Sequence, residues 1–147
     1  KLLNLVGPCR AYFGAKDYQQ TVVIRRMVRD LNLDAGVRVM PTVRDPDGLA
    51  MSSRNRYLNA GERVRARVIS RVLSEMKRAI LEERSSIARV KAWGIRALKK
   101  AVDRVQYLEV VDPETLEPVK KIQPRLVALA ACLVGKTRLI DNVTITV

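Results

Sequence analysis

The sequence predicts two architectures in succession, an α/β part over residues 1–57 and a small α+β part over residues 58–147. In the α/β part a strand-like run, an amphipathic helical segment and another strand-like run follow one another, which is the order of a parallel βαβ unit. In the α+β part a pair of amphipathic helical segments precedes three strand-like runs. This order favours two helices packed on a three-stranded, mostly antiparallel sheet.

Local signals support each element of the α/β part. Residues 1–6 are typical of the last turn of a helix, ended by the Gly-Pro pair that follows. Residues 10–14 form a strand-like run, and a helix is predicted to begin after Asp17 and to end over residues 32–36. Residues 37–43 supply the other strand. Two strands are marginal by themselves, so this part needs more chain or another subunit.

The α+β part begins after a polar, turn-rich loop. A capping pattern over residues 59–62 predicts a long helix with Val64 and Ile69 on its apolar side. Ser85 or Ser86 opens another helix, which contains Ile87, Val90, Trp93 and Leu98. The three predicted strands are residues 105–111, 126–134 and 139–147.

Composition excludes several classes of protein. Hydrophobic residues make up 48% of the 147 and charged residues 29%, which is typical of a soluble globular protein. The longest apolar run, residues 126–134, is too short to span a bilayer, and no signal-peptide pattern is visible. Cys9 and Cys132 lie in no metal or disulfide spacing. We therefore expect a cytoplasmic protein without a tightly bound, protein-ligated metal.

Histidine is absent from the sequence. Imidazole is the usual general base near neutral pH and the commonest metal ligand, so Ser-His-Asp, Cys-His and His-metal mechanisms are excluded for this chain acting alone. Any chemistry must use other side chains or groups that a partner supplies.

The net charge of +13 is concentrated over residues 58–101, which carry twelve Lys or Arg against four Asp or Glu. A basic surface favours anionic partners, and nucleic acid is one interpretation. The other is the solvated side of an amphipathic helix, because Arg63, Arg67 and Arg71 recur at i, i+4 and i+8. No aromatic residue is interleaved with these arginines, as a surface for single strands requires, so we favour the solvated face.

Two segments are candidates for binding an anion. Residues 13–20 (Phe-Gly-Ala-Lys-Asp-Tyr-Gln-Gln) lie where a strand passes into a helix, so backbone amides, the helix dipole and Lys16 favour a phosphate or carboxylate there. Equally open is the interpretation that Asp17 and Gln20 cap the helix. Residues 51–55 (Met-Ser-Ser-Arg-Asn) suit a triphosphate, because hydroxyls and a guanidinium fork donate to phosphate oxygens. The alternative is that these serines cap local turns.

A third segment, Gly135-Lys136-Thr137, looks like the end of a phosphate-binding P-loop but does not fit that motif. The glycine required five positions earlier is replaced by Ala130, and strands flank the segment in place of a helix. The sequence therefore predicts a hairpin turn here.

Three blocks of the sequence closely resemble the pantothenate synthetase family, whose members are also called pantoate–β-alanine ligases. They are residues 13–20, residues 41–58 (Pro-Thr-Val-Arg-Asp-Pro-Asp-Gly-Leu-Ala-Met-Ser-Ser-Arg-Asn-Arg-Tyr-Leu) and residues 135–142 (Gly-Lys-Thr-Arg-Leu-Ile-Asp-Asn). The resemblance covers essentially the whole chain but only about the C-terminal half of the family's usual chain. It implies that residues 1–57 complete a Rossmann-like nucleotide-binding domain and that residues 58–147 form the small C-terminal domain.

The resemblance also implies an activity. Family members are cytoplasmic dimers of the coenzyme A pathway that join pantoate to β-alanine through pantoyl adenylate, with ATP and Mg²⁺ as a substrate complex. Lys16 and Arg54 would stabilise charge on the phosphates, and Gln20 would bind pantoate. The residues implied to contact ATP are Gly14, Ala15, Lys16, Asp17, Val43, Met51, Ser52, Ser53 and Arg54.

Two departures from the family pattern matter. Ala15 stands where the family usually has Glu, and the family's His-x-Gly-His motif belongs to its N-terminal half. We therefore expect no catalytic residue in this chain and no ligase activity without that half. Two other classes stay open. One is a non-catalytic remnant that associates through its α+β module, with the exposed sheet edge of the N-terminal part favouring self-association. The other is a basic nucleic-acid-binding module.

Overall fold

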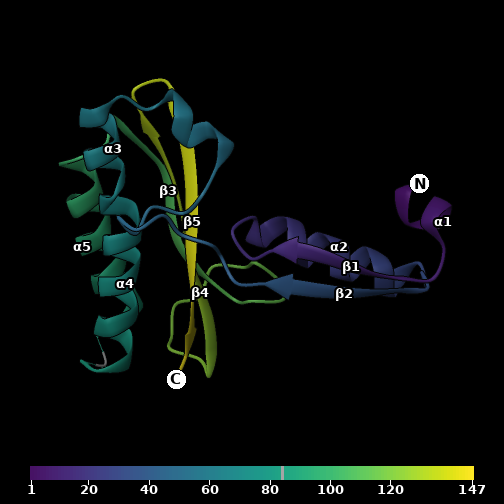
Figure 1. Cartoon of the computed structure of the whole chain (residues 1–147). Coiled ribbons are helices and arrows are strands. Elements are labelled where there is room, and N and C mark those ends of the chain that lie inside the picture. Colours follow the sequence, from purple (N-terminus) through teal and green to yellow (C-terminus); the bar gives the residue numbers. More distant parts are fainter. Residues whose placement is uncertain (84) are drawn as a thin grey trace. The chain divides into compact units, whose positions relative to one another are not determined.

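The computed structural model describes residues 1–83 and 85–147. The chain divides into two compact units, Lys1–Thr42 and Val43–Val147. The first contains a two-stranded parallel sheet and the second a three-stranded antiparallel sheet (Figure 1), so the predicted α/β and α+β fold class is confirmed. Within the described residues, no helix has the length and apolar character needed to cross a membrane.

The first unit is a βαβ piece preceded by a short helix. Its elements are α1 (Leu2–Val6), β1 (Cys9–Gly14), α2 (Tyr18–Asp30) and β2 (Ala35–Met40). The two strands pair in parallel, with Cys9 opposite Ala35 and Gly14 opposite Met40. Asn32, with a φ of 48°, takes the left-handed conformation that commonly follows a helix, and the chain turns there into β2.

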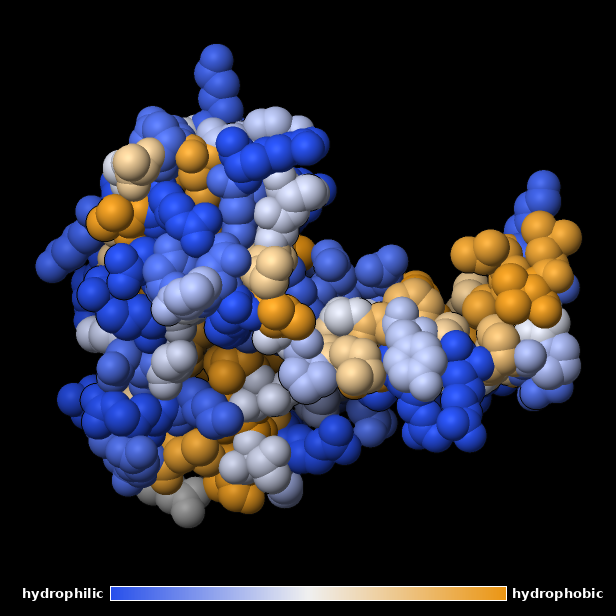
Figure 2. Space-filling view, in the orientation of Figure 1, coloured by the Kyte–Doolittle hydropathy of each residue, from blue (hydrophilic) through white to orange (hydrophobic). Residues whose placement is uncertain are grey.

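The first unit buries very little of its own surface. Thr21 is its one buried residue, whereas Leu2, Leu5 and Tyr12 are 73%, 74% and 62% exposed. Figure 2 shows the hydrophobic surface gathered at the helix that Figure 1 labels α1. Parallel sheets are normally covered on both faces, whereas this two-stranded sheet leaves Tyr12 exposed.

The second unit consists of helices packed on an antiparallel sheet. Its elements are the 3₁₀ helix η1 (Ser53–Tyr57), α3 (Ala60–Ala66), α4 (Val68–Leu81), α5 (Ile87–Lys99), β3 (Arg104–Val111), β4 (Arg125–Val134) and β5 (Thr137–Thr146). The strand order is β3-β4-β5, and α4 and α5 lie side by side against the sheet (Figure 1). The predicted two-helix, three-stranded arrangement is confirmed.

The core of this unit lies between the two long helices and the sheet. Helix α4 buries Ile69, Leu73 and Met76 on one face, at the spacing of an amphipathic helix. Strand β4 is the central strand and is buried along nearly its whole length, which explains its continuous apolar run. The helical and strand periodicities of the sequence therefore converge on one core.

The long helix predicted from residue 60 is wrong in one respect, because it is divided at Arg67 into α3 and α4. The capping pattern is confirmed: Asn59 accepts the Glu62 N–H and the Glu62 carboxylate accepts the Asn59 N–H. Val64, predicted on the apolar side, is 65% exposed. The face of α3 next to it carries Arg63, whose ion pairs with the preceding loop set the orientation of this short helix.

The predicted helix after Ser86 is confirmed as α5, which packs through a glycine. Trp93 is 40% exposed, and the neighbouring Gly94 is buried. A Cβ atom on Gly94 would stand 2.6 Å from Cδ2 of Leu108 and 3.0 Å from Sδ of Met76. A glycine is required here because α5 packs closely on α4 and β3.

The predicted domain boundary between residues 57 and 58 differs from the boundary between the compact units, which lies after Thr42. Residues 43–57 pack with the second unit because Leu49 belongs to its core and Arg44 pairs with Asp141. The assignment of residues 1–57 to a nucleotide-binding domain stays a prediction.

Candidate functional site

The first group of candidate residues forms the turn between β1 and α2. Gly14 is the last residue of β1, and Ala15, Lys16 and Asp17 follow before α2 begins. The N–H of Ala15 donates to the carbonyl of Met40 at 2.8 Å, so the turn is attached to the end of β2. The turn therefore lies at the carboxyl ends of both parallel strands, where open α/β sheets bind their ligands.

The carboxylate of Asp17 does not cap α2. Asp17 occupies the N-cap position, but only its backbone carbonyl contributes, accepting the Thr21 N–H at 3.2 Å. The capping interpretation of Asp17 is therefore wrong, and its side chain is exposed. Gln20 is exposed on the first turn of α2, and no heavy atom beyond Gly14 and its two chain neighbours lies within 4 Å of the place where a Cβ on Gly14 would stand. Within the first unit, a ligand can approach this turn directly.

The second group begins with Val43 and Met51, which a tight loop brings together. The N–H of Met51 donates to the carbonyl of Val43 at 2.9 Å, and the adjacent residues Arg44 and Ala50 form an antiparallel bridge. Gly48 closes the loop with a φ of +86°, a conformation that glycine adopts without strain. Val43 and Met51, which belong to the same block of the sequence, thus lie side by side.

The Ser-Ser-Arg segment forms the start of η1. The Ser52 hydroxyl accepts the N–H of Arg54 at 3.2 Å, so the interpretation that a serine caps a local turn is confirmed for Ser52. Ser53 and Arg54 are exposed. Among the described residues, no carboxylate pairs with the Arg54 guanidinium, and its five donors are therefore available to an anion.

Asn55 holds this segment in place, a role that no sequence signal indicated beyond its position in the motif. Its side chain is 9% exposed, and its Nδ2 donates to the carbonyl of Ala50 at 3.1 Å. Its Oδ1 is buried and has no hydrogen-bond partner within the described part of the chain. An unpaired buried amide oxygen costs free energy, which reduces the net stabilisation that the Asn55 hydrogen bond to Ala50 provides.

An ion pair fixes the same loop to the sheet. Arg44 donates from both terminal nitrogens to Asp141, at 2.7 Å and 3.0 Å, and Asp141 is 5% exposed. The N–H of Asn142 also donates to Asp141, at 2.8 Å. Sequence reasoning missed this pair, although both arginine and aspartate stood in the resembling blocks.

A further set of charges fixes the Asp-Pro-Asp-Gly turn. Arg63 contacts Asp45 and Asp47, each at 2.8 Å. Burial opposes the ionisation of Asp47, but the hydrogen bonds from Arg63 and from the Leu49 N–H outweigh it and lower the pKa of Asp47. The Asp47 carboxylate is therefore ionised at neutral pH. The two contacts of Arg63 fix the loop that carries the candidate residues at two points.

The Gly135-Lys136 segment is the hairpin turn between β4 and β5, as predicted, because Val134 pairs with Thr137. Gly135 has a φ of +57°, and its N–H donates to Oδ2 of Asp103 at 2.7 Å. The P-loop interpretation is thereby excluded, since no helix follows the glycine.

The candidate residues fall on both compact units. Lys16 belongs to the first unit, and Val43 through Arg54 belong to the second. Each unit carries its own cationic group at a turn, and a shared pocket for one ligand stays a prediction.

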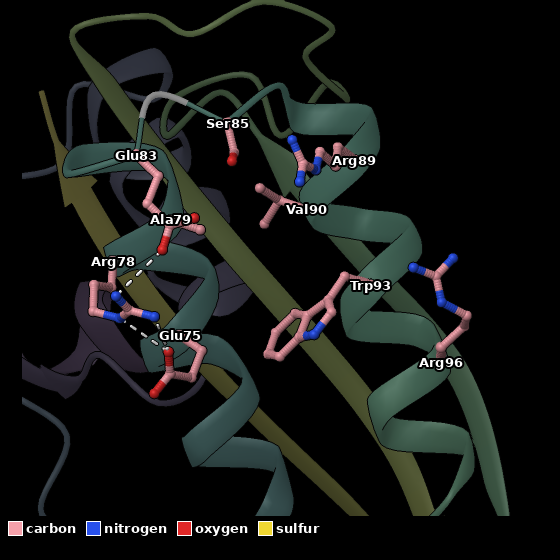
Figure 3. A pocket seen from close by; sticks show the side chains of 9 residues that line it. All are labelled: Glu75, Arg78, Ala79, Glu83, Ser85, Arg89, Val90, Trp93 and Arg96. Carbon is pink, nitrogen blue, oxygen red and sulfur yellow. Dashed lines mark hydrogen bonds and ion pairs between the residues drawn. The ribbon is translucent and has the colours of Figure 1, made fainter.

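A groove elsewhere on the second unit contains none of the predicted site residues. It lies between α4 and α5 and is lined on the α5 side by Trp93, Arg89 and Arg96, with the Trp93 ring pointing toward α4 (Figure 3). The Arg78 side chain on α4 contacts Glu75 at 2.9 Å and Glu83 at 3.2 Å. The cation on this side of the groove is therefore already paired within the chain.

Comparison with known proteins identifies relatives along the whole chain. The chain is 48% identical over 145 residues to the pantothenate synthetase of Thermosipho melanesiensis, and 49% identical over 146 residues to that of Thermodesulfovibrio yellowstonii. These matches cover 99% of this chain and 52% of each relative. The chain thus spans about half the length of the curated relatives it matches.

Solved structures agree with this match. The crystal structure of pantothenate synthetase from Thermus thermophilus has a TM-score of 0.91 at 44% identity, over 97% of this chain and 51% of that one. The pantoate-beta-alanine ligase from Francisella tularensis, complexed with beta-gamma ATP and beta-alanine, has a TM-score of 0.66 at 29% identity, over 97% and 46%. The model of the family described as pantoate-beta-alanine ligase matches residues 1–144. The chain therefore belongs to the pantoate–β-alanine ligase family.

Proposed function

We propose that this chain is the part of a pantoate–β-alanine ligase that binds the triphosphate of ATP. The observation that carries the proposal is the family match over residues 1–144, together with a relative whose structure is complexed with beta-gamma ATP and beta-alanine. The turn that carries Lys16 and the anchored loop that carries Arg54 support it, because each places a cationic residue at a turn next to a glycine or a helix start. Family membership carries the further proposal of a cytoplasmic homodimer.

The proposed reaction has two steps. The carboxylate of pantoate attacks the α-phosphorus of ATP, which forms pantoyl adenylate and releases pyrophosphate. The amine of β-alanine then attacks the acyl carbon, AMP leaves with the acyl C–O electron pair, and the amine loses a proton. Negative charge moves onto phosphate oxygens in the first step, so cationic donors in fixed positions accelerate it.

Specific residues of this chain serve these steps. Lys16 and Arg54 stabilise charge on the phosphates, while the backbone of Gly14 and Ala15, together with Asp17, contacts the nucleotide. Val43 lies beside the adenine, Met51, Ser52 and Ser53 line the approach, and Gln20 binds pantoate. Mg²⁺ enters with ATP as part of the substrate.

The proposal includes a requirement for the family's N-terminal half. The chain contains no histidine, and the first unit exposes apolar residues on a two-stranded sheet that other protein normally covers. We propose that the N-terminal half covers this unit and supplies the histidine motif. In the complete enzyme, Ala15 contributes through its backbone, since methyl groups make no polar contacts.

The test is reconstitution. The chain is purified alone and also co-expressed with the N-terminal half of a family member, and pantothenate, AMP and pyrophosphate are measured. We expect no product from the chain alone and matched amounts of the three products from the pair. Activity of the chain alone would contradict the requirement for the other half, and formation of ADP in place of AMP would contradict the adenylate route.

A second candidate function is a non-catalytic remnant that self-associates through the first unit. The exposure of Leu2, Leu5 and Val6 at 73%, 74% and 61% favours it, because apolar surface of this kind promotes association. Size-exclusion chromatography with and without ATP distinguishes the two functions. An oligomer that is indifferent to ATP, and inactive with the N-terminal half, favours the remnant.

A further inference from the structure

A hollow in the second unit is lined by cationic residues from two segments that are far apart in the sequence, η1 and the β4–β5 hairpin. Arg54 and Tyr57 of η1 line one side, and Lys136 and Arg138 of the β4–β5 hairpin line the other, with Glu62 beside them. Strand β5 and η1 are in contact, and the hairpin ends beside η1 in Figure 1. All of these residues belong to one compact unit, so its packing alone sets their positions.

The cations of this hollow are not neutralised by the described residues. Arg54 and Lys136 are exposed and pair with no carboxylate in residues 1–83 and 85–147. Arg138 donates through Nε to Oε1 of Gln106 at 2.7 Å, a neutral partner that orients the guanidinium without cancelling its charge. Three positive charges thus face one space.

The single carboxylate at the hollow is held by other contacts. Oε2 of Glu62 accepts the N–H of Asn59 at 2.9 Å, and its carboxylate lies against Gly135. This geometry holds Glu62 in the capping box at the start of α3. The hollow therefore keeps an excess of two positive charges, which matches a doubly charged or more highly charged anion.

We propose that this hollow binds the β- and γ-phosphates of ATP, which leave as pyrophosphate, and that Lys136 and Arg138 act with Arg54 in binding them. The inference rests on the proposed function, because Arg54 is the residue through which the nucleotide reaches this space. A guanidinium fork and an ammonium on opposite sides of a diphosphate are the donors that phosphate oxygens favour. The hairpin holds Lys136 in place because the Gly135 N–H is bonded to Asp103.

The alternative destination for a polyanion is the groove between α4 and α5 (Figure 3), which also carries arginines. There Arg78 is paired with Glu75, Glu82 and Glu83, so some of the charge is cancelled locally. The experiment must therefore report where an anion binds as well as how tightly.

The test is an NMR titration of the ¹⁵N-labelled chain with inorganic pyrophosphate and, separately, with AMP. Pyrophosphate should shift the amide signals of Arg54, Lys136 and Thr137, and AMP should leave the Lys136 and Thr137 signals in place. The Lys136→Gln variant should bind pyrophosphate about fivefold more weakly. The matched control is Lys121→Gln, an exposed lysine outside the hollow, which should bind as the unchanged chain does.

Every other result overturns the inference. Shifts confined to the groove of Arg89 and Arg96, an absence of pyrophosphate binding, or equal weakening by Lys121→Gln would each do so. If Arg54→Gln weakens binding and Lys136→Gln does not, the inference fails while the proposed role of Arg54 stands. Failure of the ligase proposal itself is read separately, from the absence of pantothenate in the reconstituted enzyme.

Discussion

Arg44 and Asp141, which stand 97 positions apart in the chain, form a two-pronged ion pair with N···O distances of 2.7 Å and 3.0 Å. The pair joins the loop that carries Val43 and Met51 to strand β5. Asp141 is nearly fully buried, so its charge is compensated by this one guanidinium and by the Asn142 N–H. The position of the loop that carries Val43 and Met51 therefore depends on Asp141, which belongs to the resembling block of residues 135–142.

Replacing Asp141 tests this dependence. Asp141→Asn leaves the Arg44 guanidinium without its anion, and we expect the free energy of unfolding of the second unit to fall by about 2 kcal/mol. Urea unfolding followed by circular dichroism measures the change. The control Glu75→Gln removes an exposed ion pair with Arg78 and should leave the unfolding midpoint unchanged. Equal effects of the two substitutions would show that Arg44 does not anchor the loop.

The close packing at Gly94 gives another prediction. Gly94→Ala places a methyl group 2.6 Å from Leu108 and 3.0 Å from Met76, both fully buried. Overpacking should outweigh the helix propensity gained, with a net destabilisation of about 1 kcal/mol. Gly61→Ala, in an exposed turn of α3, meets only ordinary contacts and should stabilise the protein slightly. A stabilised Gly94→Ala protein would mean that α5 packs less closely than the structure has it.

Glu62 and Gly135 should be coupled energetically. A Cβ on Gly135 would overlap the Glu62 carboxylate, and the residue also has a left-handed φ of +57°. Gly135→Ala should therefore cost about 3 kcal/mol in the unchanged chain but only about 1 kcal/mol in a Glu62→Ala background, where the backbone strain alone remains. Thermal unfolding of the four proteins of this cycle measures the coupling. Additive effects would contradict the contact.

The acid stability of the second unit should depend on Asp103. Hydrogen bonds from the Gly135 N–H and then from Arg65 lower the pKa of Asp103 below its ordinary value of 3.8. A carboxyl whose pKa is lower in the folded state stabilises the fold above the unfolded-state pKa, and loses that contribution as the pH falls through the folded-state pKa. Stability should therefore decline from about pH 5 to about pH 2.

Asp103→Asn removes this titration. The variant should be less stable than the unchanged chain at pH 6, and its stability should fall less steeply on acidification. Urea unfolding at intervals of pH measures both slopes, and Glu114→Gln, on an exposed turn, serves as the control for a lost carboxylate. If stability fell equally steeply with pH in Asp103→Asn, the hydrogen bond from the Gly135 N–H would not be what lowers the pKa of Asp103.

Local signals in the sequence predicted most of the fold. The capping box of Asn59 and Glu62, the βαβ order and the three strands depend on neighbouring residues, and the structure confirms them. The prediction for Val64 is wrong because periodicity assigns a side chain to a face by spacing alone, and it cannot register the ion pairs of Arg63 with aspartates of the preceding loop. The close contact of Gly94 with Leu108 likewise leaves no periodic signal.

The candidate site was predicted through motifs and could not have been assembled from spacing. The sequence identified Lys16, Val43 and Arg54 as residues of the blocks that resemble the family. The hydrogen bond between Met51 and Val43 and the ion pair of Arg44 with Asp141 arise only from tertiary packing. Contacts between residues so distant in the chain leave no periodic trace. The same holds for the hollow between η1 and the hairpin.

The measurement that tests the central claim most directly is calorimetric titration of ATP into the enzyme reconstituted with the N-terminal half of a family member. The unchanged chain is compared with the double variant Lys16→Ala, Arg54→Ala. Two lost charge-assisted contacts should weaken ATP binding by about a hundredfold or more. Equal ATP affinity of the two reconstituted proteins would contradict the proposal that this chain binds the triphosphate of ATP.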